Sequence, residues 1–231
     1  ASTSSLKKGE SFKDTAQNIE AMKIDAVVMR HPAPGAPKHL TDFIDAVVIN
    51  AGDGTHEHPT QAILDMMSLQ EKFGYIKGLN VAIVGDINHS RVARSNIYGL
   101  VTMGANVTLC GPPNLIPDNI IDLGVKVNYN IDEVIEWADA VNVLRIQRER
   151  MGIGIIPSER EYRALFGVTE ERLARRGNEL VIMHPGPMNR GVEIDDRVAD
   201  SDQAIILDQV LNGVASRMSI LYLLLGSQEE G

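Results

Sequence analysis

Cysteine and long apolar runs are scarce in this sequence, and each scarcity excludes a class of protein. A single cysteine, Cys110, among 231 residues excludes a disulfide framework and a zinc site built from thiolates. The longest apolar run, residues 220–225, is too short to cross a bilayer, and residues 1–10 lack the apolar stretch of a signal peptide. We therefore expect a soluble, cytoplasmic protein with no membrane partner.

Basic residues are also in the minority. The chain has 31 acidic and 22 basic side chains, which gives a formal net charge of −9 with histidine neutral. Nucleic acids and anionic membranes attract basic surfaces, so this balance argues against a nucleic-acid partner. Hydrophobic residues make up 44% of the chain, a value typical of folded globular proteins.

Short apolar runs alternate with amphipathic stretches along the whole chain. Strands buried on both faces and separated by helices predict an α/β fold with parallel sheets. A turn-rich segment at 73–80 marks a candidate domain boundary, and the last helix, at 208–225, is apolar enough to pack between layers and return to the first domain. The predicted strands lie at 26–29, 46–49, 81–84, 107–109, 125–129, 140–144, 180–183 and 204–207, and the clearest other helices at 59–72, 90–103, 131–137 and 170–176.

Cationic side chains follow the ends of several predicted strands. Arg30, His58, Arg91 and Arg145 each lie just beyond such an end, where ligands bind in open α/β sheets. Any one of them could serve a structural salt bridge instead. Together, in an acidic protein, they predict a cleft for a small substrate with two or more anionic groups.

Other chemistries fit the sequence poorly. The stretch after residue 84 holds only Gly85 of a dinucleotide fingerprint, which disfavours a nicotinamide cofactor. His56 and His58 form an H-x-H pair, yet a metal site would need further ligands that the sequence does not offer nearby. With no serine or cysteine nucleophile beside a base, the chemistry should be direct transfer helped by positioning and oxyanion stabilisation.

Seven segments, in order, give the chain a recognisable pattern. They are SSLKKGESFKDT, VMRHP, NAGDGTHEHPTQ, VGDINHSRVARS, LRIQRER, HPGPMNRGVEID and QVLNGVASRM. This combination resembles the aspartate carbamoyltransferase family. The resemblance implies two doubly wound parallel-sheet domains, a carbamoyl-phosphate domain at 1–65 plus 207–231 and an aspartate domain at 66–206, joined by a C-terminal return helix. It also implies carbamoyl transfer from carbamoyl phosphate to L-aspartate in pyrimidine synthesis, with no cofactor and no metal.

The matching positions imply a carbamoyl-phosphate site. Arg30 would bind the phosphate and the carbonyl oxygen, and His58 would donate a hydrogen bond to that oxygen as it becomes an oxyanion. The carbamoyl nitrogen would be held by Gln61 and by the backbone carbonyls of Pro185 and Gly186.

The resemblance also implies an aspartate site shared between subunits. Arg91 would bind the α-carboxylate, while Arg145 and Gln147 would bind the side-chain carboxylate. Ser4, for which two nearby serines are alternatives, and Lys8 match a loop that reaches into a neighbouring subunit. There both would contact carbamoyl phosphate, and Lys8 would also contact aspartate, which makes the expected active unit a homotrimer.

Several alternatives stay open. The family's phosphate-binding S-T-R-T-R segment is absent from the 231 residues, so we expect a chain of this length alone to have an underfilled first domain and little activity. A non-catalytic, carbamoyltransferase-like scaffold or regulatory subunit is the main competing function. Ornithine carbamoyltransferase has a cysteine in the loop that reads HPGP here, and the R-x-Q-x-E-R run suits a dicarboxylate better. The sequence does not decide whether the trimer pairs with regulatory chains or a dihydroorotase.

Overall fold

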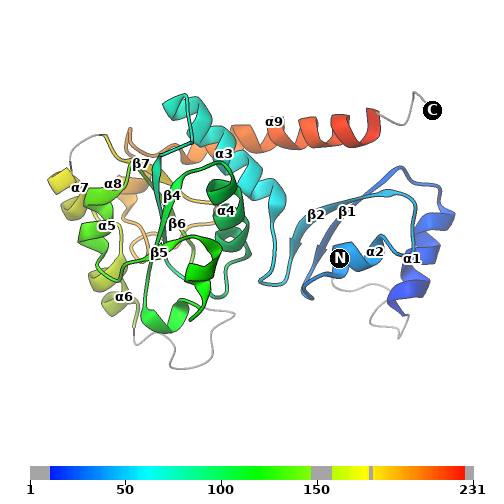
Figure 1. Ribbon diagram of the computed structural model, residues 1–231, viewed down its shortest axis with the longest axis horizontal. Helices are drawn as coiled ribbons and strands as arrows, with labels where there is room; N and C mark the ends of the chain where they lie inside the picture. Colours follow the sequence, from blue (N-terminus) through cyan, green and yellow to red (C-terminus); the bar gives the residue numbers. More distant parts are fainter. Residues whose placement is uncertain (1–10, 147–157, 177–178, 227–231) are drawn as a thin grey trace.

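Two parallel sheets, each beside its own helices, make up the protein (Figure 1). The computed structural model describes residues 11–146, 158–176 and 179–226. Within them a two-stranded sheet has the order β1-β2, and a five-stranded sheet has the order β5-β4-β3-β6-β7. Every pairing in both sheets is parallel, which confirms the α/β architecture with parallel sheets.

The two-stranded sheet has a small core. Ala16, Leu40 and Ile44 are the buried residues of its apolar cluster, with Phe12 and Phe43 packed against them. The N-terminal helix begins where the Ser11 hydroxyl accepts a hydrogen bond from the Asp14 N–H at 3.1 Å, an ordinary N-cap. The elements of this unit are α1 (Phe12–Ala21), β1 (Ala26–His31), α2 (Ala36–Leu40) and β2 (Val47–Asp53).

The five-stranded sheet carries the main core. Its central strands are buried over their whole apolar length, because helices cover both faces, and this explains why they do not alternate polar and apolar residues. Its first helix starts at the N-cap Ser90. The elements are β3 (Asn80–Val84), α4 (Arg91–Thr102), β4 (Asn106–Cys110), the 3-10 turns η2 (Pro113–Leu115) and η3 (Ile120–Leu123), β5 (Lys126–Val127), α5 (Ile131–Trp137), β6 (Ala140–Val143), α6 (Glu159–Phe166), α7 (Glu170–Arg176), β7 (Val181–Met183) and α8 (Asp196–Ala199).

Two long helices connect the sheets. The chain passes from β2 into α3 (Pro59–Phe73) before it reaches β3, and α9 (Ile206–Leu225) packs along α3 and extends toward the two-stranded unit (Figure 1). Buried amides fix this packing: Asn212 Nδ2 donates to Ser68 Oγ at 3.1 Å and to Glu71 Oε2 at 2.6 Å.

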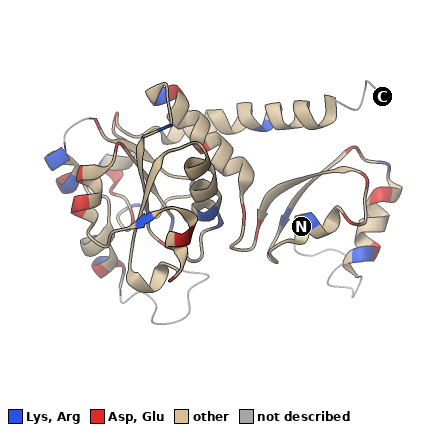
Figure 2. Cartoon of the chain, in the orientation of Figure 1, with Lys and Arg blue, Asp and Glu red and all other residues tan. Residues whose placement is uncertain are grey.

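Most of the remaining surface of α9 is apolar. Leu207 is 82% exposed and Tyr222 is 78% exposed, and the helix is drawn almost entirely in tan in Figure 2, whereas charged residues mark many of the other helices. No helix in the described ranges is both long enough and apolar enough to cross a membrane.

One predicted strand is wrong. At 204–207 the structure has a single bridge, Ala204 to Ile182, and the helix begins at Ile206. The apolar run is real, since Ile205 and Ile206 are buried, but it enters the core as the first turn of a helix. The strand expected at 125–129 is also shorter, because only Lys126 and Val127 pair with β4.

Candidate active site

The carboxyl ends of both sheets meet at one cavity of about 340 Å³. Parallel strands place their carboxyl ends at one edge, so residues that follow different strands come together there. Seven of the ten predicted site residues line this cavity: Arg30, His58, Gln61, Arg91, Arg145, Pro185 and Gly186. The other three, Ser4, Lys8 and Gln147, lie outside the described residues.

Cations dominate the lining. Arg30 lies near the end of β1 and is exposed, Arg145 follows β6 and is half-buried, and Arg91 begins α4 and is only 7% exposed. Among the described residues that line the cavity, none is a carboxylate. Guanidinium groups pair bidentately with carboxylates and phosphates, so the cavity suits a small ligand with several anionic groups.

His58 stands at the start of α3 with its backbone held in place. Its N–H donates to Ser95 Oγ at 2.8 Å, and the Ser95 hydroxyl donates a short hydrogen bond to Glu57. Burial lowers the pKa of His58 to about 4, helped by the charges of Arg91, Arg30 and Arg217. The imidazole is therefore neutral near pH 7, so one ring nitrogen carries a proton that it can donate.

Arg91 packs against the backbone of Gly52 and Gly54. A Cβ on Gly52 would lie 2.8 Å from the Arg91 Nε, closer than real contacts allow, and Gly52 has a φ of +116°. The Arg91 Nη1 also donates to the Gly54 carbonyl at 3.3 Å. Only glycine at position 52 leaves room for the guanidinium, and this explains why a glycine-rich turn lies at the site.

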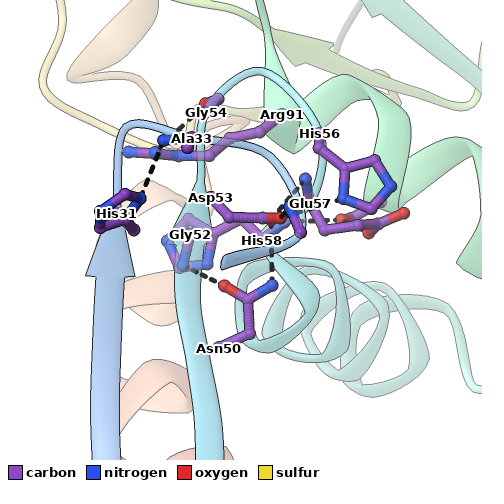
Figure 3. A network of polar contacts seen from close by, with 12 residues as sticks. His31, Ala33, Asn50, Gly52, Asp53, Gly54, His56, Glu57, His58 and Arg91 are labelled. Atoms are coloured by element: carbon purple, nitrogen blue, oxygen red, sulfur yellow. Dashed lines mark hydrogen bonds and ion pairs between the residues drawn. The ribbon is translucent and has the colours of Figure 1, made fainter. Parts of the chain in front are cut away.

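Asp53 organises the loop between β2 and α3 (Figure 3). Its Oδ1 accepts from Asn50 Nδ2 and from the Glu57 N–H, both at 3.0 Å, and its Oδ2 accepts from the Gly35 N–H at 2.6 Å. Burial would raise the pKa of Asp53, but hydrogen bonds from Asn50, Gly35 and His56 outweigh burial and lower it. The loop that presents His58 is thus fixed around an ionised carboxylate.

A second rigid loop follows β7. His184 is buried, and its Nδ1 accepts from the Gly186 N–H at 2.9 Å. Gly186 has a φ of +65°, in the left-handed region that favours glycine. This local bond fixes the backbone of Pro185 and Gly186, and both residues line the cavity.

Several residues at the site were not predicted from the sequence. Ser90, Val92, Leu144 and Pro187 line the cavity, and each is a direct chain neighbour of a predicted residue, so proximity in the sequence was a usable signal. Ser95 lies four residues after Arg91, which places it on the same face of α4.

The metal interpretation of the H-x-H pair finds no support. His56 Nδ1 contacts Asp53 Oδ2 at 3.1 Å, whereas His58 lines the cavity. Across the described ranges, no group of three or more His, Cys, Asp or Glu side chains is placed to hold a metal ion. Cys110 is buried, and burial raises the pKa of its thiol to about 12.

Two family models match the chain. The carbamoyl-P binding domain of aspartate/ornithine carbamoyltransferase matches residues 1–71, and the Asp/Orn binding domain of the same family matches residues 77–224. The two models meet between α3 and β3, near the boundary segment at 73–80.

Similar proteins are named aspartate carbamoyltransferase rather than ornithine carbamoyltransferase. The aspartate carbamoyltransferase catalytic subunit of Gemmatimonas aurantiaca is 58% identical over 98% of this chain and 71% of its own length, and that of Moorella thermoacetica is 58% identical over 97% and 73%. The crystal structure of the Trypanosoma cruzi aspartate transcarbamoylase with N-(phosphonacetyl)-L-aspartic acid aligns over 96% of this chain and 72% of that one, with a TM-score of 0.84 and 27% identity. The catalytic subunit of M. jannaschii aspartate transcarbamoylase aligns over 97% of this chain and 74% of that one, with a TM-score of 0.81 and 34% identity. With its cationic cavity between two parallel sheets, the chain belongs to the aspartate carbamoyltransferase family.

Proposed function

We propose that this protein transfers the carbamoyl group of carbamoyl phosphate to L-aspartate, giving N-carbamoyl-L-aspartate and phosphate. The observation that carries the proposal is the cavity itself, in which three arginines and a neutral histidine meet at the ends of both sheets. A phosphate and two carboxylates match that charge.

The reaction needs positioning and charge stabilisation more than covalent catalysis. The aspartate amine bonds to the carbonyl carbon, the bond from that carbon to the phosphate oxygen breaks with its electron pair leaving on phosphate, and the amine loses a proton. His58 donates a hydrogen bond to the carbonyl oxygen as negative charge develops, and Arg30 pairs with that oxygen and the phosphate. Gln61 and the carbonyls of Pro185 and Gly186 receive the carbamoyl NH₂.

The second substrate, aspartate, binds to arginines of the larger unit. Arg91 pairs with the α-carboxylate of aspartate, and Arg145, together with Gln147, pairs with its side-chain carboxylate. Because both carboxylates of aspartate are held, its amine is aligned with the carbonyl carbon. Such positioning of two reactants accelerates their reaction.

The assembly, location and domain division belong to the same proposal. In the proposed homotrimer Ser4 and Lys8 complete the site of a neighbouring copy, and the lone cysteine fits the cytoplasm. Residues 1–65 with 207–231 bind carbamoyl phosphate, and residues 66–206 bind aspartate.

Product formation tests the function directly. The purified chain is incubated with carbamoyl phosphate and either aspartate or ornithine, and the carbamoylated products are quantified. We expect product with aspartate, at a low rate for a chain of 231 residues alone, none with ornithine, and inhibition by N-(phosphonacetyl)-L-aspartate. Binding of that analogue without any product would favour the non-catalytic scaffold, and product with ornithine alone would contradict the proposed substrate.

A further inference from the structure

A fully buried carboxylate, Asp65, lies behind the cavity and binds four side-chain amides. Its Oδ1 accepts from Gln61 Nε2 at 3.0 Å and from Gln209 Nε2 at 2.7 Å. Its Oδ2 accepts from Asn96 Nδ2 at 2.8 Å and from Asn142 Nδ2 at 3.3 Å. These donors come from α3, α9, α4 and β6, so one acidic side chain joins four elements next to the site.

The bond from Gln61 decides which end of its amide faces the cavity. Because Nε2 donates one of its two N–H groups to Asp65, the acceptor Oε1 is the end of the amide turned away from that carboxylate. Gln61 is buried and lines the cavity, so this oxygen is an acceptor placed for an N–H donor. With the amide reversed, the same side chain would present a donor and repel an NH₂ group.

The loop after β7 leads back to the same carboxylate oxygen. Gln209, held by Asp65 Oδ1, accepts at its Oε1 from the His184 N–H at 2.9 Å. His184 in turn accepts from the Gly186 N–H. Both sets of acceptors assigned to the carbamoyl nitrogen, the Gln61 amide and the backbone carbonyls of this loop, are thus fixed from one atom.

The side chain of Asp65 is fully buried, and its four amide partners compensate for the loss of water around it. Burial raises the pKa of Asp65, and the amides of Asn96, Gln209, Gln61 and Asn142 oppose that rise. Amides hold the carboxylate without adding a positive charge. A buried acid satisfied by four donors rigidifies its surroundings and allows one arrangement of the donors.

We propose that Asp65 is a positioning residue that makes the site selective for an acyl phosphate bearing an NH₂ group. This inference rests on the function proposed above. Asp65 touches no substrate; it acts through Gln61 and Gln209, and it fixes hydrogen-bond acceptors where the carbamoyl nitrogen lies.

The test compares carbamoyl phosphate with acetyl phosphate, which has a methyl group in place of NH₂ and yields N-acetylaspartate. Asp65→Asn keeps the shape but replaces an acceptor with a donor, so the Gln61 amide is no longer held one way round. We expect the ratio of kcat/KM for carbamoyl over acetyl phosphate to fall about tenfold, the effect of one lost hydrogen bond, with little change in the KM for aspartate. An unchanged ratio in a folded Asp65→Asn protein overturns the proposal.

Two controls separate positioning from general stability. Ser68→Ala removes another buried polar group of α3 whose partners are the Leu64 carbonyl and Asn212, and it should lower stability while it keeps the wild-type ratio. In a Gln61→Ala background, Asp65→Asn should lower the ratio by less than it does in the otherwise unaltered protein, because only the route through Gln209 remains. An equal loss in Ser68→Ala, or an undiminished fall in the double variant, contradicts the assigned route.

A measurement on the unaltered protein covers the case in which Asp65→Asn does not fold. The side-chain NH₂ signals of Gln61, assigned by comparison with Gln61→Ala, should exchange slowly with water and stay protected when carbamoyl phosphate binds. Loss of that protection on binding means that the NH₂ end meets the ligand, and the proposal fails. Failure of the proposed function gives a different result, because wild-type protein would then form no carbamoyl aspartate at all.

Discussion

At the scale of single residues, Arg145 offers the clearest separation of the two substrates. In the proposed function Arg145 is a bidentate partner of one carboxylate of aspartate, so for Arg145→Ala we expect the KM for aspartate to rise by one to two orders of magnitude, about the effect of a lost charge-assisted hydrogen bond. Carbamoyl phosphate binding should stay close to wild type. Steady-state kinetics and calorimetry with carbamoyl phosphate check both, and an equal loss for the two substrates would contradict the assignment.

His58 should titrate far below an ordinary histidine. Its pKa is lowered to about 4, so the unfolded chain, with a pKa of 6.5, takes up the proton first as the pH falls. Its contribution to the free energy of unfolding therefore decreases between about pH 6.5 and pH 4. Histidine NMR signals followed against pH measure the value directly.

The pKa of His58 also depends on the charges of nearby arginines. Arg217→Gln should raise the pKa of His58, because it removes one of the three cations that oppose protonation. Arg197 is exposed and paired with Glu170, and it does not contribute to the His58 pKa, so Arg197→Gln is the matched control. A pKa that is the same in both variants would mean that the charge of Arg217 does not contribute to it.

At the scale of elements, the contact between α3 and α9 holds the return helix in place. Asn212→Ala removes two hydrogen bonds and leaves the buried Ser68 hydroxyl and the Glu71 carboxylate without their amide donor. We expect the free energy of unfolding to fall by about 1–3 kcal/mol. Val214→Ala on the same helix, at a side chain 57% exposed, should change it by under about 0.5 kcal/mol. Urea denaturation of both variants makes the comparison.

The same scale shows what a sequence can predict. Apolar runs located β3 and β6 because buried parallel strands carry almost no polar residues. They do not single out α8, a helix of four residues, or α2, which has a proline in its first turn. The run at 204–207 was misassigned because a short buried segment has the same composition in a strand and in a helix start.

The site follows the same logic. Arg30, Arg91 and Arg145 could be found because the rule for strand ends needs only the order of elements. Asp65 could not, since its bond to Gln209 spans 144 residues, and nothing local distinguishes it from a surface aspartate. Contacts made through tertiary packing leave no periodic signal in the chain.

At the scale of the molecule, the cavity joins two units of unequal stability. The apolar cluster of the two-stranded unit has three buried residues, far fewer than the clusters of the five-stranded unit, so the smaller unit should open more easily. N-(phosphonacetyl)-L-aspartate would contact both units at once. Its binding should slow hydrogen exchange in β1 and β2 more than in β3 and β6, as mass spectrometry can measure. Equal slowing in all four strands would contradict this difference in stability.

The lone, buried thiol of Cys110 also has a practical consequence. A disulfide reagent in solution has no other sulfhydryl to modify in the 231 residues, and this one lies at the end of β4, inside the larger sheet. The rate at which Cys110 is labelled therefore reports how often the larger sheet opens enough to expose this thiol. The native thiol is therefore a built-in probe of kinetic stability, and its labelling can be followed by absorbance with no engineered residue.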